Sequence, residues 1–231
     1  MKKINTILAA LGALLMLTVT SANSIEFKTG VSANAMAAYA NAKEEMKGGT
    51  RTTNEEAILA TSFASFFAEI SSEELMGLGI GVSYAPEVAE LEKETRTIQN
   101  TSGNAANDSG DQIIDGKIQD LASIYLTLPV GDNGAYVKAG YIQATLKTNE
   151  QLATGSKYND IDMSGTQVGG GYEGSLGESV FWRAEGSLQM WEDISASGSE
   201  GGRVAASSLQ KNKISAELGS VVGSLSVGMK F

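Results

Sequence analysis

The sequence predicts an all-β fold, a closed antiparallel up-and-down transmembrane β-barrel in one domain. Three observations predict it: an export signal at the N-terminus, eight segments in which apolar and polar residues alternate, and connections that alternate between short and long. Eight strands fit these segments best. Ten strands remain an alternative if residues 213–231 and the second long connection each contain one more strand.

The N-terminus has the features of a signal peptide. Lys2 and Lys3 form a basic start, and residues 7–19 form an apolar run that is too short and wrongly flanked for a spanning helix. Small residues then predict cleavage after Ala22 or Ser24, so we expect residues 1–22 to be removed and 23–231 to form the barrel. Loss of two of the 17 basic residues changes the net charge from −10 to −12, which excludes nucleic acid as an expected partner.

The strand prediction rests on a period of two, which places successive side chains on opposite faces of a strand. In residues 180–190, Trp182 and Ala184 alternate with Arg183 and Glu185. In the last segment the apolar residues change parity, which predicts a β-bulge near Gly219. Residues 57–70 carry apolar residues on both faces, so their register cannot be read from the pattern. The segments are 27–39, 57–70, 77–84, 117–128, 135–146, 166–175, 180–190 and 213–231.

The connections separate into two classes by length. Short turns on one rim and long polar loops on the other are typical of outer-membrane barrels, in which the short turns are periplasmic. The chain has no Cys, so disulfides cannot stabilise it. The short connections are 71–75, 130–134 and 176–178, and the long ones are 40–56, 85–116, 147–165 and 191–212.

Aromatic residues are predicted to form two girdles, because amphipathic rings are favoured at both membrane interfaces. With the strands as assigned, Phe27, Tyr172 and Trp182 fall near periplasmic ends. Tyr39, Tyr84 and Tyr141 fall near outer ends. Ordinary packing in a soluble β-sandwich is the competing explanation for these residues.

Charged residues on the polar faces of strands predict a network in the lumen. An eight-stranded barrel is just wide enough for side chains to fill it, so charges inside must pair. We expect an ion pair between Glu173 and Arg183, with Glu185 as a further partner. The predicted lumen charge network comprises Lys138, Glu173, Arg183 and Glu185.

Turn parity predicts the register of two hairpins. Parity requires a loop of even length between residues 130 and 135, which can be a two-residue turn at 132–133 or 133–134 or a four-residue loop at 131–134. The turn at 132–133 and the four-residue loop would both set Leu128 opposite Val137. A three-residue loop at 176–178 would set Tyr172 opposite Trp182, with Gly177 in a left-handed conformation.

The sequence offers no site for catalysis, cofactor or metal. It contains no His, the usual general base or acid of hydrolytic sites, and no Cys. Its Gly-rich stretches do not form a phosphate-binding turn into a helix. We therefore expect a protein that is not an enzyme.

The chain ends in the residues SVGMKF, with apolar residues at alternate positions before the terminal Phe. Together with the pattern of strands and loops, this end resembles the small outer-membrane barrels that include opacity proteins, OmpX and the OmpA membrane domain. The resemblance implies residence in the outer membrane of a Gram-negative bacterium after Sec-type export. It also implies an assembly signal for the barrel assembly machinery, made of Leu225, Val227, Met229 and Phe231.

The expected function is a non-enzymatic barrel that presents four long polar loops for adhesion, surface contact or envelope structure. A narrow, porin-like pore that passes small solutes or ions is the alternative. Expected partners are outer-membrane lipid and lipopolysaccharide, the barrel assembly machinery, and an extracellular ligand or host surface. A monomer is favoured over an oligomer.

Overall fold

The structure, a computed structural model, describes residues 25–45, 52–91, 94–98, 110–151, 158–197 and 213–231. Eight strands form a closed antiparallel barrel in the order β1-β2-β3-β5-β6-β7-β8-β10, and β10 returns to β1. The prediction of an eight-stranded up-and-down barrel is confirmed, while the signal peptide lies outside the described residues. The strands are β1 (Ile25–Glu45), β2 (Thr52–Ser72), β3 (Leu78–Glu90), β5 (Gly110–Pro129), β6 (Ala135–Gln151), β7 (Ile161–Ser175), β8 (Val180–Trp191) and β10 (Lys213–Lys230).

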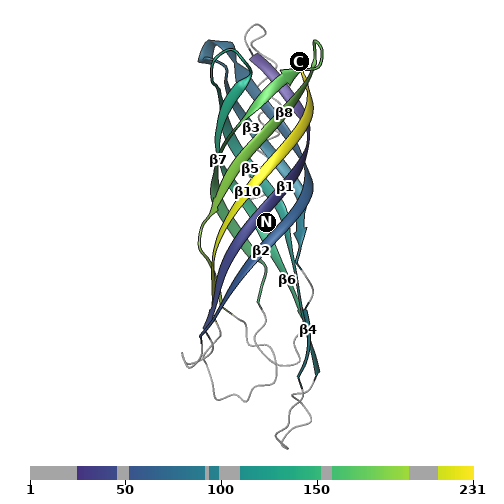
Figure 1. Ribbon diagram of the computed structural model, residues 1–231, viewed down its shortest axis with the longest axis vertical. Helices are drawn as coiled ribbons and strands as arrows, with labels where there is room; N and C mark the ends of the chain where they lie inside the picture. Colours follow the sequence, from purple (N-terminus) through teal and green to yellow (C-terminus); the bar gives the residue numbers. More distant parts are fainter. Residues whose placement is uncertain (1–24, 46–51, 92–93, 99–109, 152–157, 198–212) are drawn as a thin grey trace, which may run out of the picture.

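Figure 1 shows the strands tilted against the long axis, with the C-terminus and the short turns at the upper end. We call this end the short-turn rim and the opposite end the long-loop rim. A single turn of 3-10 helix, η2 (Glu73–Leu75), connects β2 to β3 at the short-turn rim. Among the described residues, no helix is long and apolar enough to cross a membrane.

Strands β1 and β10 close the barrel over their whole length. They pair from Lys28 with Lys230 to Glu45 with Lys213 without a register shift, and Phe27 and Phe231 exchange two backbone hydrogen bonds of 3.2 and 2.9 Å. The predicted bulge near Gly219 is therefore wrong. The apolar parity changes in β10 because the lumen becomes apolar toward the long-loop rim, where Leu218 packs against buried apolar residues.

Two further strands exist but do not widen the barrel. Strand β4 (Glu94–Ile98) pairs with β5 beyond the end of the β3 ladder. Strand β9 (Ile194–Ser197) pairs with β10 beyond the end of the β8 ladder. Each continues the preceding strand along the same neighbour, so the ten-stranded alternative is wrong.

The hairpin of β5 and β6 has the predicted register. Leu128 lies opposite Val137, and Val130 N donates to Ala135 O at 2.8 Å, which leaves a four-residue loop at 131–134. Gly131 and Gly134 have φ angles of 71° and 88°, a region that glycine enters without steric cost.

The hairpin of β7 and β8 is shifted by two residues from the predicted register. Tyr172 pairs with Ala184 instead of Trp182, and Glu173 lies directly opposite Arg183. Leu176 N donates to Val180 O at 2.8 Å, so the three-residue loop is 177–179. Gly177 is not among the residues with positive φ, and its predicted left-handed conformation is wrong. Parity alone fixes which face a residue occupies, but it leaves a shift of two undecided.

The outer face carries an apolar belt. Outward residues such as Val31 on β1 and Leu225 on β10 are 53% and 67% exposed. Toward the long-loop rim, the outward residues of the same two strands become polar, as at Asn41 and Glu217. About 9–11 tilted residues cross a bilayer core, yet β1 and β2 each have 21 residues. Parts of the predicted long loops are therefore strand, and the barrel wall extends beyond the belt.

One seam in the wall is paired over only part of its length. Strand β2 pairs with β1 from Thr52 to Ser72, but with β3 only from Phe66 to Ser72. On β3 the ladder stops at Tyr84, two residues before Pro86, which lacks an N–H. Farther along, the Thr61 hydroxyl donates to Val88 O at 3.0 Å. Side-chain contact thus replaces part of the ladder there.

The register of β7 and β8 can be tested by cross-linking, because the chain has no Cys of its own. Oxidation should join Tyr172→Cys to Ala184→Cys in the folded barrel, since these positions are direct partners. Tyr172→Cys with Trp182→Cys is the matched control and should remain largely unlinked. Efficient linkage of the control pair, measured by gel mobility after reduction-sensitive cross-linking, would restore the register predicted from parity.

Candidate functional site

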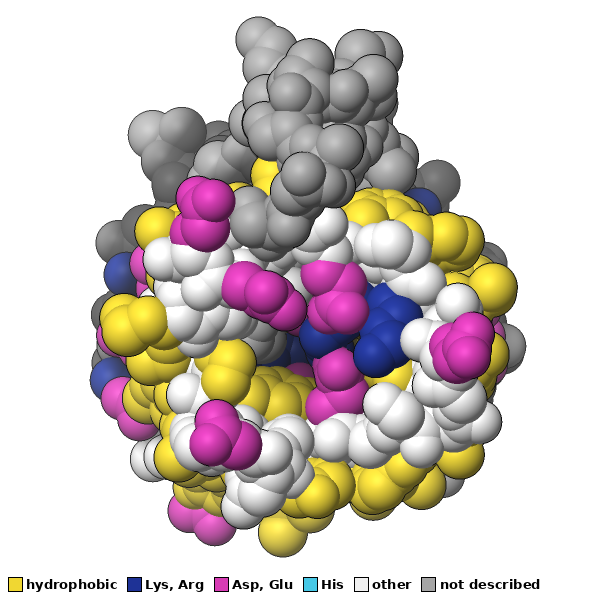
Figure 2. All heavy atoms as spheres, turned by 90° about the horizontal axis from the view of Figure 1, so that it is seen from above, with side chains coloured by type: hydrophobic (Ala, Val, Ile, Leu, Met, Phe, Trp, Pro, Cys, Tyr) yellow, Lys and Arg dark blue, Asp and Glu magenta, His cyan; other side chains and the backbone are white. Residues whose placement is uncertain are grey.

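A charged layer crosses the lumen near the short-turn rim. Five strands contribute to it, and Figure 2 shows acidic and basic side chains gathered around the central hollow at this end of the barrel. Three of its side chains are basic and three are acidic, so the layer is neutral. Its members are Lys28 on β1, Glu69 on β2, Lys138 on β6, Glu173 on β7, and Arg183 and Glu185 on β8.

Arg183 is the centre of this layer. Its Nη1 and Nη2 donate to Oε2 and Oε1 of Glu69 at 2.9 and 2.7 Å, and its Nε donates to Glu173 Oε2 at 2.7 Å. Glu69 is only 2% exposed, and Arg183 is 6% exposed. A bidentate pair of this kind is among the strongest charge-assisted contacts in proteins. Glu173 also accepts from Lys28 Nζ at 2.9 Å, so four side chains from four strands form one chain of contacts.

Glu185 belongs to a second, smaller group. Its Oε1 accepts from Lys138 Nζ at 2.8 Å, and its Oε2 accepts from the Tyr136 hydroxyl at 2.9 Å. The Lys138 ammonium also lies 4.2 Å from the centre of the Tyr125 ring. Both carboxylate oxygens of Glu185 are thereby satisfied without Arg183.

Aromatic rings surround the Arg183 guanidinium. Its central carbon lies 5.1 Å from the Phe181 ring centre and 5.4 Å from both the Phe67 and Tyr136 centres. These distances are within the range of cation–π attraction. The Arg183 side chain is therefore largely buried, with 6% of the residue exposed.

Glycines provide the space for these rings. Each ring of the charged layer lies directly across the ladder from a glycine, as Phe67 does from Gly30 and Tyr125 from Gly81. A β-carbon added at Gly81 would overlap the Tyr125 ring. Tyr136 with Gly171 and Phe181 with Gly228 repeat the arrangement. The lumen-facing glycines are therefore required by the size of their neighbours.

The structure brings together the four residues that the sequence assigns to the lumen network, but in two groups. Glu173 contacts Arg183, whereas Glu185 contacts Lys138 and is no partner of Arg183 in the described contacts. Sequence reasoning missed Glu69 and Lys28. Lys28 shows the lumen parity of its strand in the sequence. Glu69 lies in the segment whose two faces could not be distinguished, and only the register of β2 places it inside.

The residues assigned to the girdles and to the assembly signal lie on the outer face. Phe27 lies against Phe231, with ring centres 6.1 Å apart, and Tyr172 lies against Trp182 at 5.8 Å, both at the short-turn rim. Tyr39, Tyr84 and Tyr141 lie farther along their strands toward the long-loop rim, and the Tyr84 hydroxyl donates to Asp120 at 2.6 Å. Leu225, Val227, Met229 and Phe231 are all exposed on the outside.

The charged layer is suited to filling the lumen. All six of its charges have partners of opposite sign. In the described part of the chain, no group of three or more acidic side chains could hold a metal ion. The arrangement stabilises the barrel across its diameter, since it ties β1 and β2 to β7 and β8.

Removal of Arg183 should expose the difference between its two acidic partners. Arg183→Met leaves Glu69 without a cation, a loss of about 3–5 kcal/mol by analogy with other broken buried pairs, whereas Glu173 keeps Lys28. Adding Glu69→Gln should recover much of the loss. Adding Glu173→Gln should recover little, because Glu173 still pairs with Lys28 and is not left without a cation when Arg183 is lost. Urea unfolding in micelles measures these differences, and equal recovery by both would contradict the bidentate assignment.

The ring and glycine pairs make a separate prediction. Gly81→Ala should destabilise the barrel by about 1–3 kcal/mol, the usual cost of overpacking, because the added methyl group meets the Tyr125 ring. Gly223→Ala is the control, since a β-carbon there meets nothing within 4 Å. Similar unfolding midpoints for the two variants would show that the Tyr125 ring does not require the glycine.

No protein-family model and no curated protein sequence matches the chain. Solved structures with a similar arrangement include the outer membrane protein OprG of Pseudomonas aeruginosa, with TM-score 0.48, 14% identity, and coverage of 90% of this chain and 96% of that one. Ail, the attachment invasion locus protein of Yersinia pestis in complex with the heparin analogue sucrose octasulfate, gives TM-score 0.39, 10% identity and coverages of 87% and 99%. The outer membrane protease OmpT of Escherichia coli gives 0.37, 9%, 89% and 97%.

These structures are similar to this chain in fold. Evidence that the barrel lies in a membrane comes from the chain's own residues. A sheet inside a lipid bilayer must close on itself, because an open edge would leave unpaired backbone groups in hydrocarbon. The chain meets this condition through the β1–β10 ladder, and it carries an apolar belt on its outer face. By this closed barrel and this belt, the chain has the architecture of a transmembrane β-barrel.

Proposed function

We propose that this protein is a non-enzymatic, non-conducting surface barrel that holds a polar platform above the outer membrane for contact with other surfaces. The observation that carries the proposal is the asymmetry of the wall. The apolar belt begins at the short-turn rim, and the strands continue past it toward the long-loop rim. The short-turn rim is then periplasmic, and the extended wall faces outward.

The polar part of the wall forms the base of this platform, and we call it the collar. Its outward residues on β1, β2 and β10 carry charged, amide or hydroxyl groups, and a shallow pocket of about 340 Å³ lies among them. Solvated polar strands of this length are unnecessary for membrane spanning alone. The residues that line the pocket are Asn41, Lys43, Asn54, Asp193, Ser215, Ala216 and Glu217.

The filled lumen supports this function over the narrow pore. Six paired charges and four aromatic rings occupy the lumen near the short-turn rim, and a buried apolar cluster occupies it farther along. A water-filled porin interior needs many more strands than eight. The sequence contains no His, the usual general acid or base of hydrolytic sites, and this supports a role in contact instead of chemistry.

Surface contact can be tested in cells that express the full chain. Replacing the collar residues Asn41, Asn54 and Glu217 by Ala should lower adhesion of the cells to host-cell or abiotic surfaces, because these polar side chains line the pocket on the wall beyond the belt. Unchanged adhesion, together with unchanged surface display, would count against a contact function for this platform.

Display and orientation are measured by single cysteines. Asn41→Cys on the collar should react with a membrane-impermeant maleimide in intact cells, and Asp132→Cys in the β5–β6 turn should react only after the outer membrane is permeabilised. Val31→Cys in the belt is the control that should stay unlabelled in both cases. Labelling of Asp132→Cys in intact cells, with labelling of Asn41→Cys only after permeabilisation, would show that the orientation is inverted.

A further inference from the structure

The inward side chains of β1 and β10 change in chemical type in the same order along the two strands. From the short-turn rim, the inward residues of β1 run from Lys28 through Ser32 and Asn34 to Met36, and those of β10 run from Ser226 and Ser224 to Val222. Charged and aromatic residues come first, small polar residues follow, and apolar residues come last. The lumen therefore has three successive layers, with a small polar chamber between the charged layer and an apolar one.

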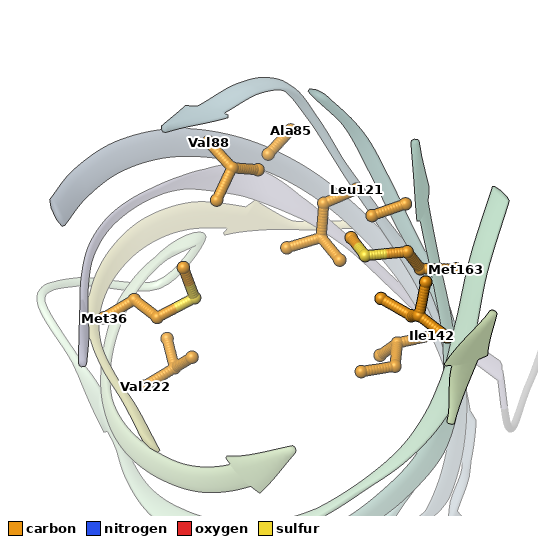
Figure 3. Packing of buried hydrophobic residues seen from close by; sticks show 9 residues of the cluster. Met36, Ala85, Val88, Leu121, Ile142, Met163 and Val222 are labelled. Carbon is orange, nitrogen blue, oxygen red and sulfur yellow. The ribbon is translucent and has the colours of Figure 1, made fainter. Parts of the chain in front are cut away.

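The apolar layer is a ring contributed by strands all around the barrel. We define the apolar ring as Met36, Val88, Leu121, Ile142, Met163 and Val222, each at most 8% exposed. Figure 3 shows their side chains directed from the wall toward the barrel interior. Because these residues face the lumen, such low exposure means that water has little access to the lumen at this level. Partly buried side chains, among them Phe63 and Leu218, pack against the ring.

The charged layer, in contrast, has polar cavities on both sides. Arg183 lines a cavity of about 250 Å³ toward the short-turn rim and also the chamber of about 60 Å³ toward the ring. About 10–15 Å³ suffices for one water molecule. The charged layer is thus a thin polar partition that can be hydrated on either side.

One buried group indicates that water occupies the chamber. Gln167 is 5% exposed and lines the chamber, and its Nε2 has no protein partner among the described residues. An unsatisfied buried amide costs about 1–3 kcal/mol. A water molecule in the chamber would remove this cost, since Ser187 and Gln189 also line the space.

We propose that the apolar ring, and not the charged layer, is the permeability seal of this barrel. An ion at the charged layer can exchange water for side-chain oxygen or nitrogen atoms, whereas the six side chains of the ring offer no polar atom to replace hydration. The neighbouring hydroxyls of Thr61 and Ser220 already donate to Val88 O and Gln189 Oε1. Hydrophobic constrictions block ions in this way, by excluding water. The chamber then communicates with the short-turn side and is closed toward the long-loop side. This inference rests on the proposed function, in which the barrel does not conduct.

The test places a thiol in the chamber. Ser187→Cys introduces the chain's single Cys at a lumen position that is 7% exposed, and Ag⁺ serves as a small cationic thiol probe. Ag⁺ is added from the short-turn side of oriented proteoliposomes before the maleimide. We expect this Ag⁺ to protect the Cys from maleimide labelling. Ag⁺ added from the long-loop side should leave the labelling unchanged.

The ring is then made polar with little change in volume. Met36→Gln with Met163→Gln, in the Ser187→Cys background, should open the long-loop side to Ag⁺, so that later labelling is lost. Met190→Gln with Met229→Gln adds the same two amides on the outer face, where both residues are exposed, and should leave that side closed. Heat-modifiable gel mobility verifies that each variant is folded.

Two results would overturn the inference. The first is reaction of the chamber thiol from the long-loop side while the ring is intact. The second is a chamber that Ag⁺ reaches from neither side in the Ser187→Cys protein. In that case, Ag⁺ would reach the thiol after Glu69→Gln with Arg183→Met but not in the folded ring variant. The Asn41 and Asp132 labels report orientation independently, so a failed surface assignment is distinguishable from a failed seal.

Discussion

Closing a sheet of only eight strands leaves a lumen so narrow that side chains must fill it, and the rest of this structure follows from that constraint. Closure itself is imposed by lipid, which offers no partner for an unpaired backbone group. The β1–β10 ladder satisfies it without a register shift. Each strand must then supply inward side chains that fit one another across a small diameter.

Charges inside such a space have to be fully partnered, and the charged layer achieves this through the arrangement of its strands. Arg183 reaches across the lumen to Glu69 and along the ladder to Glu173. Glycine opposite each ring creates the room for Phe67, Tyr125, Tyr136 and Phe181. Buried ion pairs do not by themselves raise stability above that of an apolar core. Their consequence here is specificity, because a register shift of two in β8 would separate Arg183 from both carboxylates.

The same strands serve different surroundings along their length. Near the short-turn rim they separate lipid outside from paired charges inside, and farther along they separate lipid from an apolar ring. Beyond the belt, the outward side chains are polar and face solvent, as at Asn41 and Glu217. This change explains why the alternation of apolar and polar residues is clear over the belt and weak beyond it. It also gives the barrel one short rim and one extended rim.

By itself, the sequence determined the class of fold and the side of the sheet on which most residues lie, and it favoured eight strands over ten. These properties follow from period-two alternation and from turn lengths, which are local. The Leu128–Val137 register could be predicted because the possible turns were few.

Only the tertiary structure decided the partners across the lumen. Glu69 and Arg183 are 114 residues apart in sequence, and their contact depends on the position of β2 around the barrel. The end of β10 near the long-loop rim resembles a bulge in the sequence, because its outward residues become polar while its inward residues become apolar, and alternation cannot distinguish this exchange of faces from an inserted residue. The shift of two residues between β7 and β8 escaped parity for a different reason, because it exchanges partners without exchanging faces.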